Sequence, residues 1–142
     1  MASKHEEIKR KVMIDWTRKG RGRLYQMTSG LAVPVGSDHP IWYGPTPSKR
    51  FKGFSDLFGF ENILTPSGFL WYGFGKKKTT PESLKHYIPF FCVIEIKTKN
   101  DIIKPDQKRF LDSIVDFGVL AYVAIETENE KGYELKKWEE IR

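Results

Sequence analysis

Cysteine and histidine are scarce in this sequence, and their scarcity excludes several kinds of site. The single cysteine, Cys92, rules out an intramolecular disulfide and a cysteine-rich zinc site. Because Cys92 lies within an apolar run, we expect a buried structural thiol. The three histidines, His5, His39 and His86, are scattered and show no metal-ligand spacing, so none of them is assigned a role.

Long apolar runs and the common cofactor and nucleophile motifs are also missing. No stretch is apolar enough to span a membrane, and the polar residues 1–7 include no secretory apolar segment. The sequence contains no Walker-type glycine loop, no dinucleotide fingerprint and no Ser/His/Asp set. We therefore expect a cytoplasmic protein, and a chain this small would fit a bacterial or phage origin.

The residues that are present suit one globular domain with a basic surface. The chain has 142 residues, of which 39% are hydrophobic and 14% aromatic, enough for one core, and we expect a single domain over residues 1–142. The net charge of +6 favours a polyanionic partner. Charge alone is weak support for nucleic acid, since many basic soluble proteins bind none.

Local patterns predict an α/β order of elements. Ser3 with Glu6 forms a capping-box pattern ahead of a helix whose buried stripe recurs every four residues. The expected helices are 5–19 and 105–117, and the expected strands are 24–28 (with 31–35 as a continuation), 53–63, 90–98 and 119–125. Residues 36–50 read as a loop, and the charged tail 133–142 as a short helix or strand. The path from strand 90–98 through helix 105–117 to strand 119–125 predicts a parallel βαβ unit within a mixed sheet flanked by helices.

The most informative segment is the apolar strand that ends in Glu95-Ile96-Lys97. Side chains alternate along a strand, so Glu95 and Lys97 point to the same face. Charges on a packed face need compensation, which a divalent metal near Glu95 and a phosphate near Lys97 would provide. Asp56, on another predicted strand, offers a second oxygen ligand. These residue types are the minimum set for metal-dependent phosphodiester cleavage.

The motifs Gly53-Phe54-Ser55-Asp56 and Glu95-Ile96-Lys97, with Gln107 following, resemble the PD-(D/E)XK nuclease superfamily and in particular its VRR-NUC branch. The similarity runs from the first helix to strand 119–125 and implies a restriction-endonuclease-like core. Ser55 stands where the superfamily name has proline, a residue that shapes the backbone but binds no metal. The interval between Asp56 and Glu95 exceeds what compact members need, so we expect an insertion at about residues 65–89.

The resemblance implies a role for each site residue. Asp56, Glu95 and the backbone carbonyl of Ile96 would hold Mg²⁺ or Mn²⁺, and the ion would activate a water for hydrolysis. Lys97 would orient or deprotonate that water, or stabilise the phosphate. Gln107 would support the nucleophile or contact phosphate.

The first helix is the other implied source of a site residue. The family often places a glutamate there. Glu7 is our preferred candidate for catalysis and metal binding, and Glu6 is the alternative.

Basic loops are the candidates for DNA contact, namely Lys49, Arg50, Lys52, Lys76, Lys77 and Lys78. Each part of the site also has a structural interpretation. Asp56 could end a strand, Glu95 and Lys97 could form a surface ion pair, Gln107 could be exposed, and the lysines could simply face solvent.

The resulting hypothesis is a Mg²⁺- or Mn²⁺-dependent deoxyribonuclease that cleaves duplex or branched DNA and acts as a homodimer. DNA is preferred to RNA by resemblance only. The alternatives are a four-way-junction resolvase, a catalytically silent nucleic-acid-binding module, and a structural or assembly protein.

Overall fold

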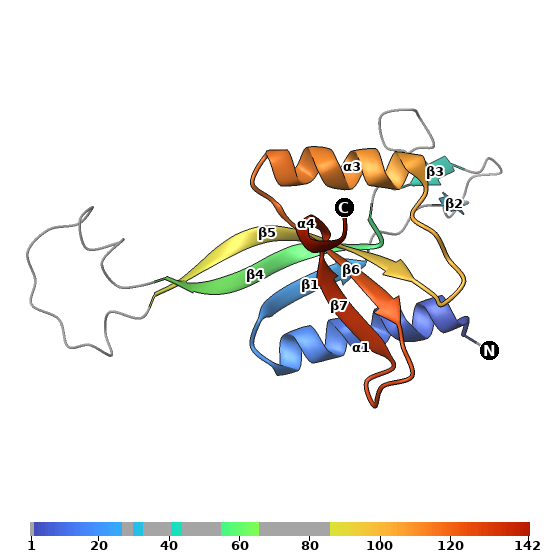
Figure 1. Cartoon of the computed structure of the whole chain (residues 1–142), viewed down its shortest axis with the longest axis horizontal. Coiled ribbons are helices and arrows are strands. Elements are labelled where there is room, and N and C mark those ends of the chain that lie inside the picture. Colours follow the sequence, from blue (N-terminus) through green and yellow to red (C-terminus); the bar gives the residue numbers. More distant parts are fainter. Residues whose placement is uncertain (1, 27–29, 33–40, 44–54, 66–85) are drawn as a thin grey trace, which may run out of the picture.

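A mixed sheet of five strands forms the centre of the protein, with helices against both faces (Figure 1). The computed structural model describes residues 2–26, 30–32, 41–43, 55–65 and 86–142. The sheet order is β1-β4-β5-β6-β7, with β5 and β6 parallel and the other pairs antiparallel. The strands are β1 (Gly22–Gln26), β4 (Leu57–Thr65), β5 (His86–Lys97), β6 (Leu120–Glu126) and β7 (Tyr133–Lys137). The expected α/β core and its parallel βαβ unit are confirmed.

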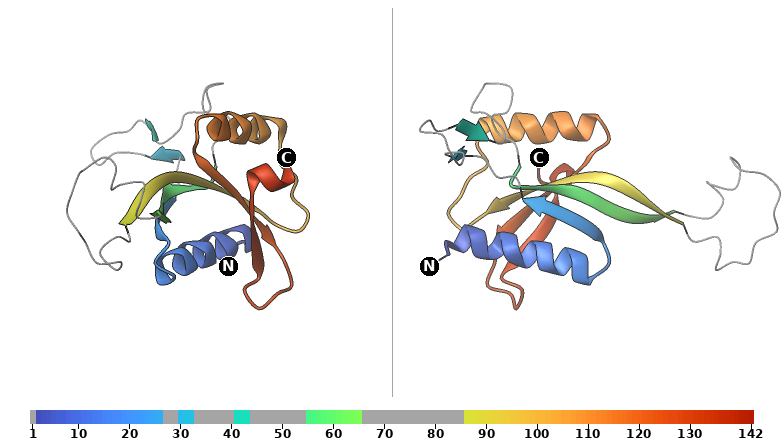
Figure 2. Two further views of the ribbon diagram at one scale, coloured as in Figure 1. Left: turned by 60° about the vertical axis from the view of Figure 1, so that its left-hand side comes forward. Right: turned by 180° about the vertical axis from the view of Figure 1, so that it is seen from behind.

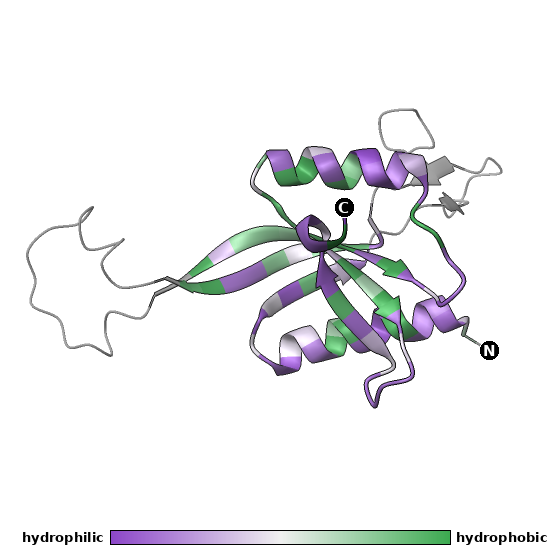
Figure 3. Cartoon of the chain, in the orientation of Figure 1, coloured by the Kyte–Doolittle hydropathy of each residue, from purple (hydrophilic) through white to green (hydrophobic). Residues whose placement is uncertain are grey.

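Helix α1 (Lys4–Arg18) covers one face of the sheet, and helix α3 (Pro105–Asp116) covers the other, as two further views show (Figure 2). Both helices alternate hydrophobic and hydrophilic residues along their length (Figure 3). Such periodicity gives each helix an apolar stripe that is stable only against another element. In the described residues, no helix is long and apolar enough to cross a membrane.

The protein has two hydrophobic clusters, one on each face of the sheet, and alternate side chains of β5 belong to one or the other. On the α1 side, Ile8, Val12 and Trp16 pack in one cluster with Ile94 and Ile96. On the α3 side, Leu111 packs with Val93 and Val123. Because strand side chains alternate, Glu95 and Lys97 share the α3 face with Val93. The order of residues along β5 therefore brings both charged groups toward the start of α3.

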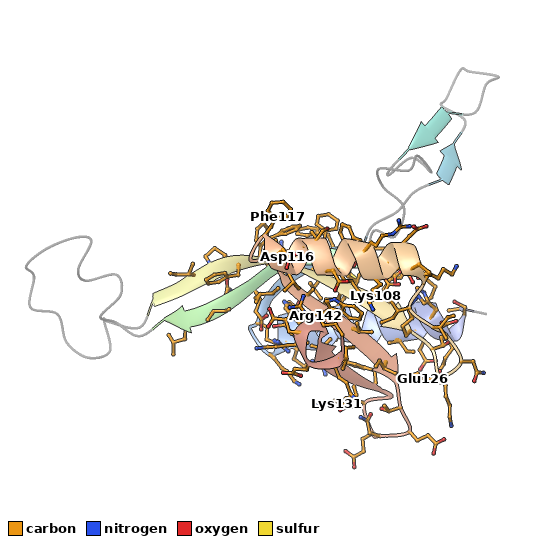
Figure 4. The ribbon with its side chains drawn as sticks, turned by 45° about the horizontal axis from the view of Figure 1, so that its top comes forward. Lys108, Asp116, Phe117, Glu126, Lys131 and Arg142 are labelled. Atoms are coloured by element: carbon orange, nitrogen blue, oxygen red, sulfur yellow. The ribbon has the colours of Figure 1, made fainter. Side chains whose placement is uncertain are left out.

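The helix predictions are confirmed almost to the residue. Ser3 caps α1, since its Oγ accepts the backbone N–H of Glu6 at 3.3 Å. Pro105 begins α3, and Gly118, with a φ of 78°, follows its end. In Figure 4, which looks onto α3, Asp116 and Phe117 mark that C-terminal end and Lys108 lies in the first half of the helix.

Several strand predictions need correction. β2 (Gly30–Ala32) does not continue β1, because it pairs with β3 (Ile41–Tyr43) in a separate two-stranded sheet. β3 lies inside the predicted loop 36–50, where an apolar triplet is flanked by Gly, Pro and Ser. Asp56 precedes β4 instead of lying within it. The predicted tail contains both β7 and the short helix α4 (Trp138–Ile141).

Both ends of the predicted insertion at 65–89 are paired strands. β4 and β5 form a long antiparallel ribbon with Asn62 opposite Pro89 and Thr65 opposite His86. This ribbon extends past the rest of the sheet (Figure 1). The remainder of the insertion, residues 66–85, falls outside the described residues.

Candidate active site

One cavity lies at the carboxyl end of β5, and residues from the N-terminal turns of α1 and α3 also line it. Both helices begin at this end of the sheet, on opposite faces (Figure 1). The cavity has a volume of about 340 Å³. It is lined by His5, Asp56, Glu95, Ile96, Lys97, Asn100, Asp101, Ile102, Lys104 and Gln107. The structure therefore brings together four of the five side chains that the sequence nominated, from three separate segments of the chain.

Glu95, Lys97 and Gln107 form a closed triangle of polar contacts. The Lys97 ammonium lies 2.9 Å from Glu95 Oε1 and donates to Gln107 Oε1 at 2.8 Å. The Gln107 amide in turn donates to Glu95 Oε1. Gln107 Oε1 also accepts the Lys104 backbone N–H at 3.0 Å, which fixes the amide at the start of α3. Gln107 is therefore a bridge between the two charged groups and not an exposed helix position.

The second oxygen of Glu95 is the most unusual atom in the site. Glu95 is only 1% exposed, and among the described residues its Oε2 has no hydrogen-bond partner. Burial, and then the nearby charge of Asp56, raises the pKa of Glu95 to about 7, although Lys97 opposes this rise. A buried, unpartnered carboxylate oxygen is costly unless a cation or a donor satisfies it.

Asp56 lies beside Glu95 because the chain bends just before β4. Its Oδ2 accepts the backbone N–H of Ile96 at 2.9 Å, so β5 holds both acidic groups. The Ile96 residue lines the cavity, as a carbonyl ligand would require, and the role of its carbonyl stays a prediction.

The donor set fits a hard divalent cation. Asp56 and Glu95 both present carboxylate oxygens to the cavity wall, and Glu95 Oε2 accepts no hydrogen bond from the described residues. Within the described part of the chain, no group of three His, Cys, Asp or Glu side chains forms a ready-made metal cage. Mg²⁺ does not need such a cage, because it is commonly held by one or two carboxylates and keeps several waters.

From helix α1, His5 lines this cavity and Glu7 does not. His5 Nε2 lies 3.3 Å from Asp56 Oδ2. Glu7 instead pairs with Lys11 at 2.7 Å and with Lys4 at 3.5 Å, and it lines a different cavity between α1 and β1. The buried stripe explains the choice. His5 precedes Ile8 by three residues and shares its face, whereas Glu7 is one residue, about 100°, away. That spacing places His5 on the buried face of α1, but only the packing of α1 against the sheet brings it to Asp56.

Of the predicted DNA-contact residues, none can be located, because Lys49, Arg50, Lys52, Lys76, Lys77 and Lys78 fall outside the described residues. Within the described part, Lys104 is a cation that sequence reasoning missed. It lines the cavity, and its charge opposes the rise in the Glu95 pKa. Its position at the N-cap of α3, just ahead of Pro105, was the available signal.

Comparison with known proteins identifies the family of the chain. No curated protein matches the chain. The family model for the VRR-NUC domain matches residues 48–125, more than half of the chain, and that span contains Asp56, Glu95, Lys97 and Gln107. Helix α1, and with it His5, lies outside the match. The chain belongs to the VRR-NUC family, a nuclease domain family of the restriction-endonuclease-like superfamily.

Proposed function

We propose that the protein is a metal-dependent endonuclease that hydrolyses DNA phosphodiester bonds at the cavity at the end of β5. The observation that carries the proposal is the buried, unpartnered Oε2 of Glu95, which lies beside Asp56 and Lys97. In a surface ion pair, both carboxylate oxygens would be exposed to water, and neither would be buried without a hydrogen-bond partner. The family supports a nuclease, and the donor set supports a divalent cation as its cofactor.

Asp56, Glu95 and the carbonyl of Ile96 are the proposed ligands for Mg²⁺ or Mn²⁺. When bound, such an ion supplies positive charge to the phosphate and an activated water. The protein's own contribution is to hold the buried carboxylate of Glu95 and the partly exposed carboxylate of Asp56 in place, which it does through Gln107 and through the Ile96 N–H.

Lys97 and Gln107 act together in this proposal. The Lys97 ammonium has three donors, and two of them face Glu95 Oε1 and Gln107 Oε1. The third is left to donate to a phosphoryl oxygen or to the attacking water. Gln107 fixes the direction of that donor, because its amide contacts both Lys97 and Glu95.

The preferred substrate and the oligomeric state belong to the same proposal. We favour DNA over RNA, in duplex or branched form, and a homodimer, since two strands would then meet two sites. A single monomer peak at micromolar concentration, with and without DNA, would exclude the dimer. We also keep a cytoplasmic location, which imaging of a tagged chain in its host would test.

The decisive experiment is a cleavage panel with supercoiled plasmid, single strands, a four-way junction and RNA, each in Mg²⁺, Mn²⁺ and EDTA. Glu95→Ala should abolish cutting. The matched control is Glu139→Gln, which removes an exposed carboxylate on α4 and should cut normally. Equal cleavage by Glu95→Ala would refute the site. Preference for the junction would indicate a resolvase, and binding without cutting would indicate a silent binding module.

A further inference from the structure

Helix α1 reaches the proposed metal site through a single side chain. His5, near the start of the helix, lines the cavity, and its Nε2 lies 3.3 Å from Asp56 Oδ2. The side chains are 30% and 26% exposed, so the contact is partly shielded from water. The apolar stripe of α1 anchors the helix in the core, and this packing sets the position of the backbone that carries the ring.

Two groups contact Oδ2 of Asp56, and neither of them contacts Oδ1. The backbone N–H of Ile96 donates to Oδ2 at 2.9 Å, and His5 Nε2 approaches the same oxygen. A carboxylate oxygen offers about two acceptor positions. Two donors on Oδ2 would therefore occupy it and direct Oδ1 toward a cation.

We propose that His5 is a positioning residue for Asp56, donating its Nε2–H to Oδ2 so that Oδ1 is presented to the divalent cation. The inference rests on the proposed function and adds a determinant of metal affinity outside the family-matched residues. Hydrogen bonds to metal-binding carboxylates usually matter, and their loss weakens metal affinity or activity by roughly 10–100-fold.

A direct ligand role for His5 fits the site less well. Imidazole nitrogen suits Zn²⁺, Ni²⁺ or Cu²⁺, whereas carboxylates and carbonyls suit Mg²⁺ and Mn²⁺. In the described residues, His5, Asp56 and Glu95 do not converge as a three-residue metal group. The contact to Asp56, not a metal cage, is what the geometry provides.

The test is the affinity of the full chain for Mn²⁺, measured by calorimetry without DNA. His5→Gln places an amide donor near the position of Nε2, whereas His5→Asn is shorter and mimics Nδ1. We expect His5→Gln to bind Mn²⁺ within about 3-fold of the parent, and His5→Asn and His5→Ala to bind roughly 10–100-fold more weakly. Thermal melting in EDTA, unchanged among the variants, would show that all of them fold.

Three results would overturn the positioning role. If His5→Ala binds Mn²⁺ as tightly as the parent, His5 does not position Asp56. If His5→Gln binds Mn²⁺ as weakly as His5→Ala, the ring nitrogen is itself a metal ligand. Weakening by Glu7→Gln, with His5→Ala unaffected, would assign the contribution of the helix to Glu7.

Asp56→Asn separates this inference from the proposed function. If the parent binds no Mn²⁺, or Asp56→Asn binds it equally well, the metal site itself is wrong. If Asp56→Asn no longer binds Mn²⁺ but His5→Ala still binds it as the parent does, the proposed metal site stands and only the positioning role of His5 is refuted.

Discussion

Replacing Glu95 by glutamine should stabilise the metal-free protein at alkaline pH. Burial first, and then the charge of Asp56, raises the pKa of Glu95 from 4.5 to about 7. The folded state therefore holds this proton more tightly than the unfolded state does. The stability contributed by the carboxyl group is full below about pH 4.5 and is lost as the pH rises through about 7.

The size of the effect follows from that difference. A rise in the pKa of Glu95 from 4.5 to about 7 corresponds to about 3 kcal/mol of unfolding free energy. The protein loses this stability as the pH rises between those two values. Glu95→Gln has the shape of the protonated carboxyl and carries no charge at any pH. We expect the variant and the parent to be similar near pH 5, and the variant to be more stable at pH 8.5 by as much as about 3 kcal/mol.

Urea unfolding in EDTA at the two pH values measures the difference, with Glu139→Gln as the matched control. Mn²⁺ at about 100 times its Kd should then stabilise the parent by about 2.7 kcal/mol and leave Glu95→Gln unaffected. A Glu95→Gln variant less stable than the parent at pH 8.5 would refute the argument, because it would mean that the buried charge contributes net stability.

The remaining predictions concern metal, geometry and DNA. The affinity of the parent for Mn²⁺ should fall as the pH drops below about 7, because protons compete for Glu95. Calorimetry at pH 6 and 8 would measure it, and equal affinities would contradict Glu95 as a ligand. Gln107→Ala should slow cleavage by roughly 10–100-fold, since it releases both Glu95 and Lys97; single-turnover rates like those of the parent would make Gln107 a bystander. Changing Lys76, Lys77 and Lys78 together to alanine should weaken DNA binding and flatten its dependence on salt, whereas an unchanged slope would exclude them from the interface.

Periodic local patterns determined much of this protein before any tertiary contact is considered. The stripe from Ile8 to Trp16 and the Ser3 cap specify α1, and Pro105 and Gly118 delimit α3. Alternation along β5 puts Glu95 and Lys97 on one face, because strand periodicity is a property of the backbone. These signals are local, so one segment of sequence contains each of them. The positions of the predicted DNA-contact lysines stay predictions.

Only the tertiary structure decided which groups complete the site. The choice of His5 over Glu7 depends on how α1 is rotated against the sheet, and packing of a whole apolar face sets that rotation. The bridge formed by Gln107 depends on where α3 begins above β5, and the contact of Asp56 with the Ile96 N–H depends on a bend before β4. Each contact joins two separate elements, 10 to 51 residues apart in the chain, and no local pattern encodes the distance between them.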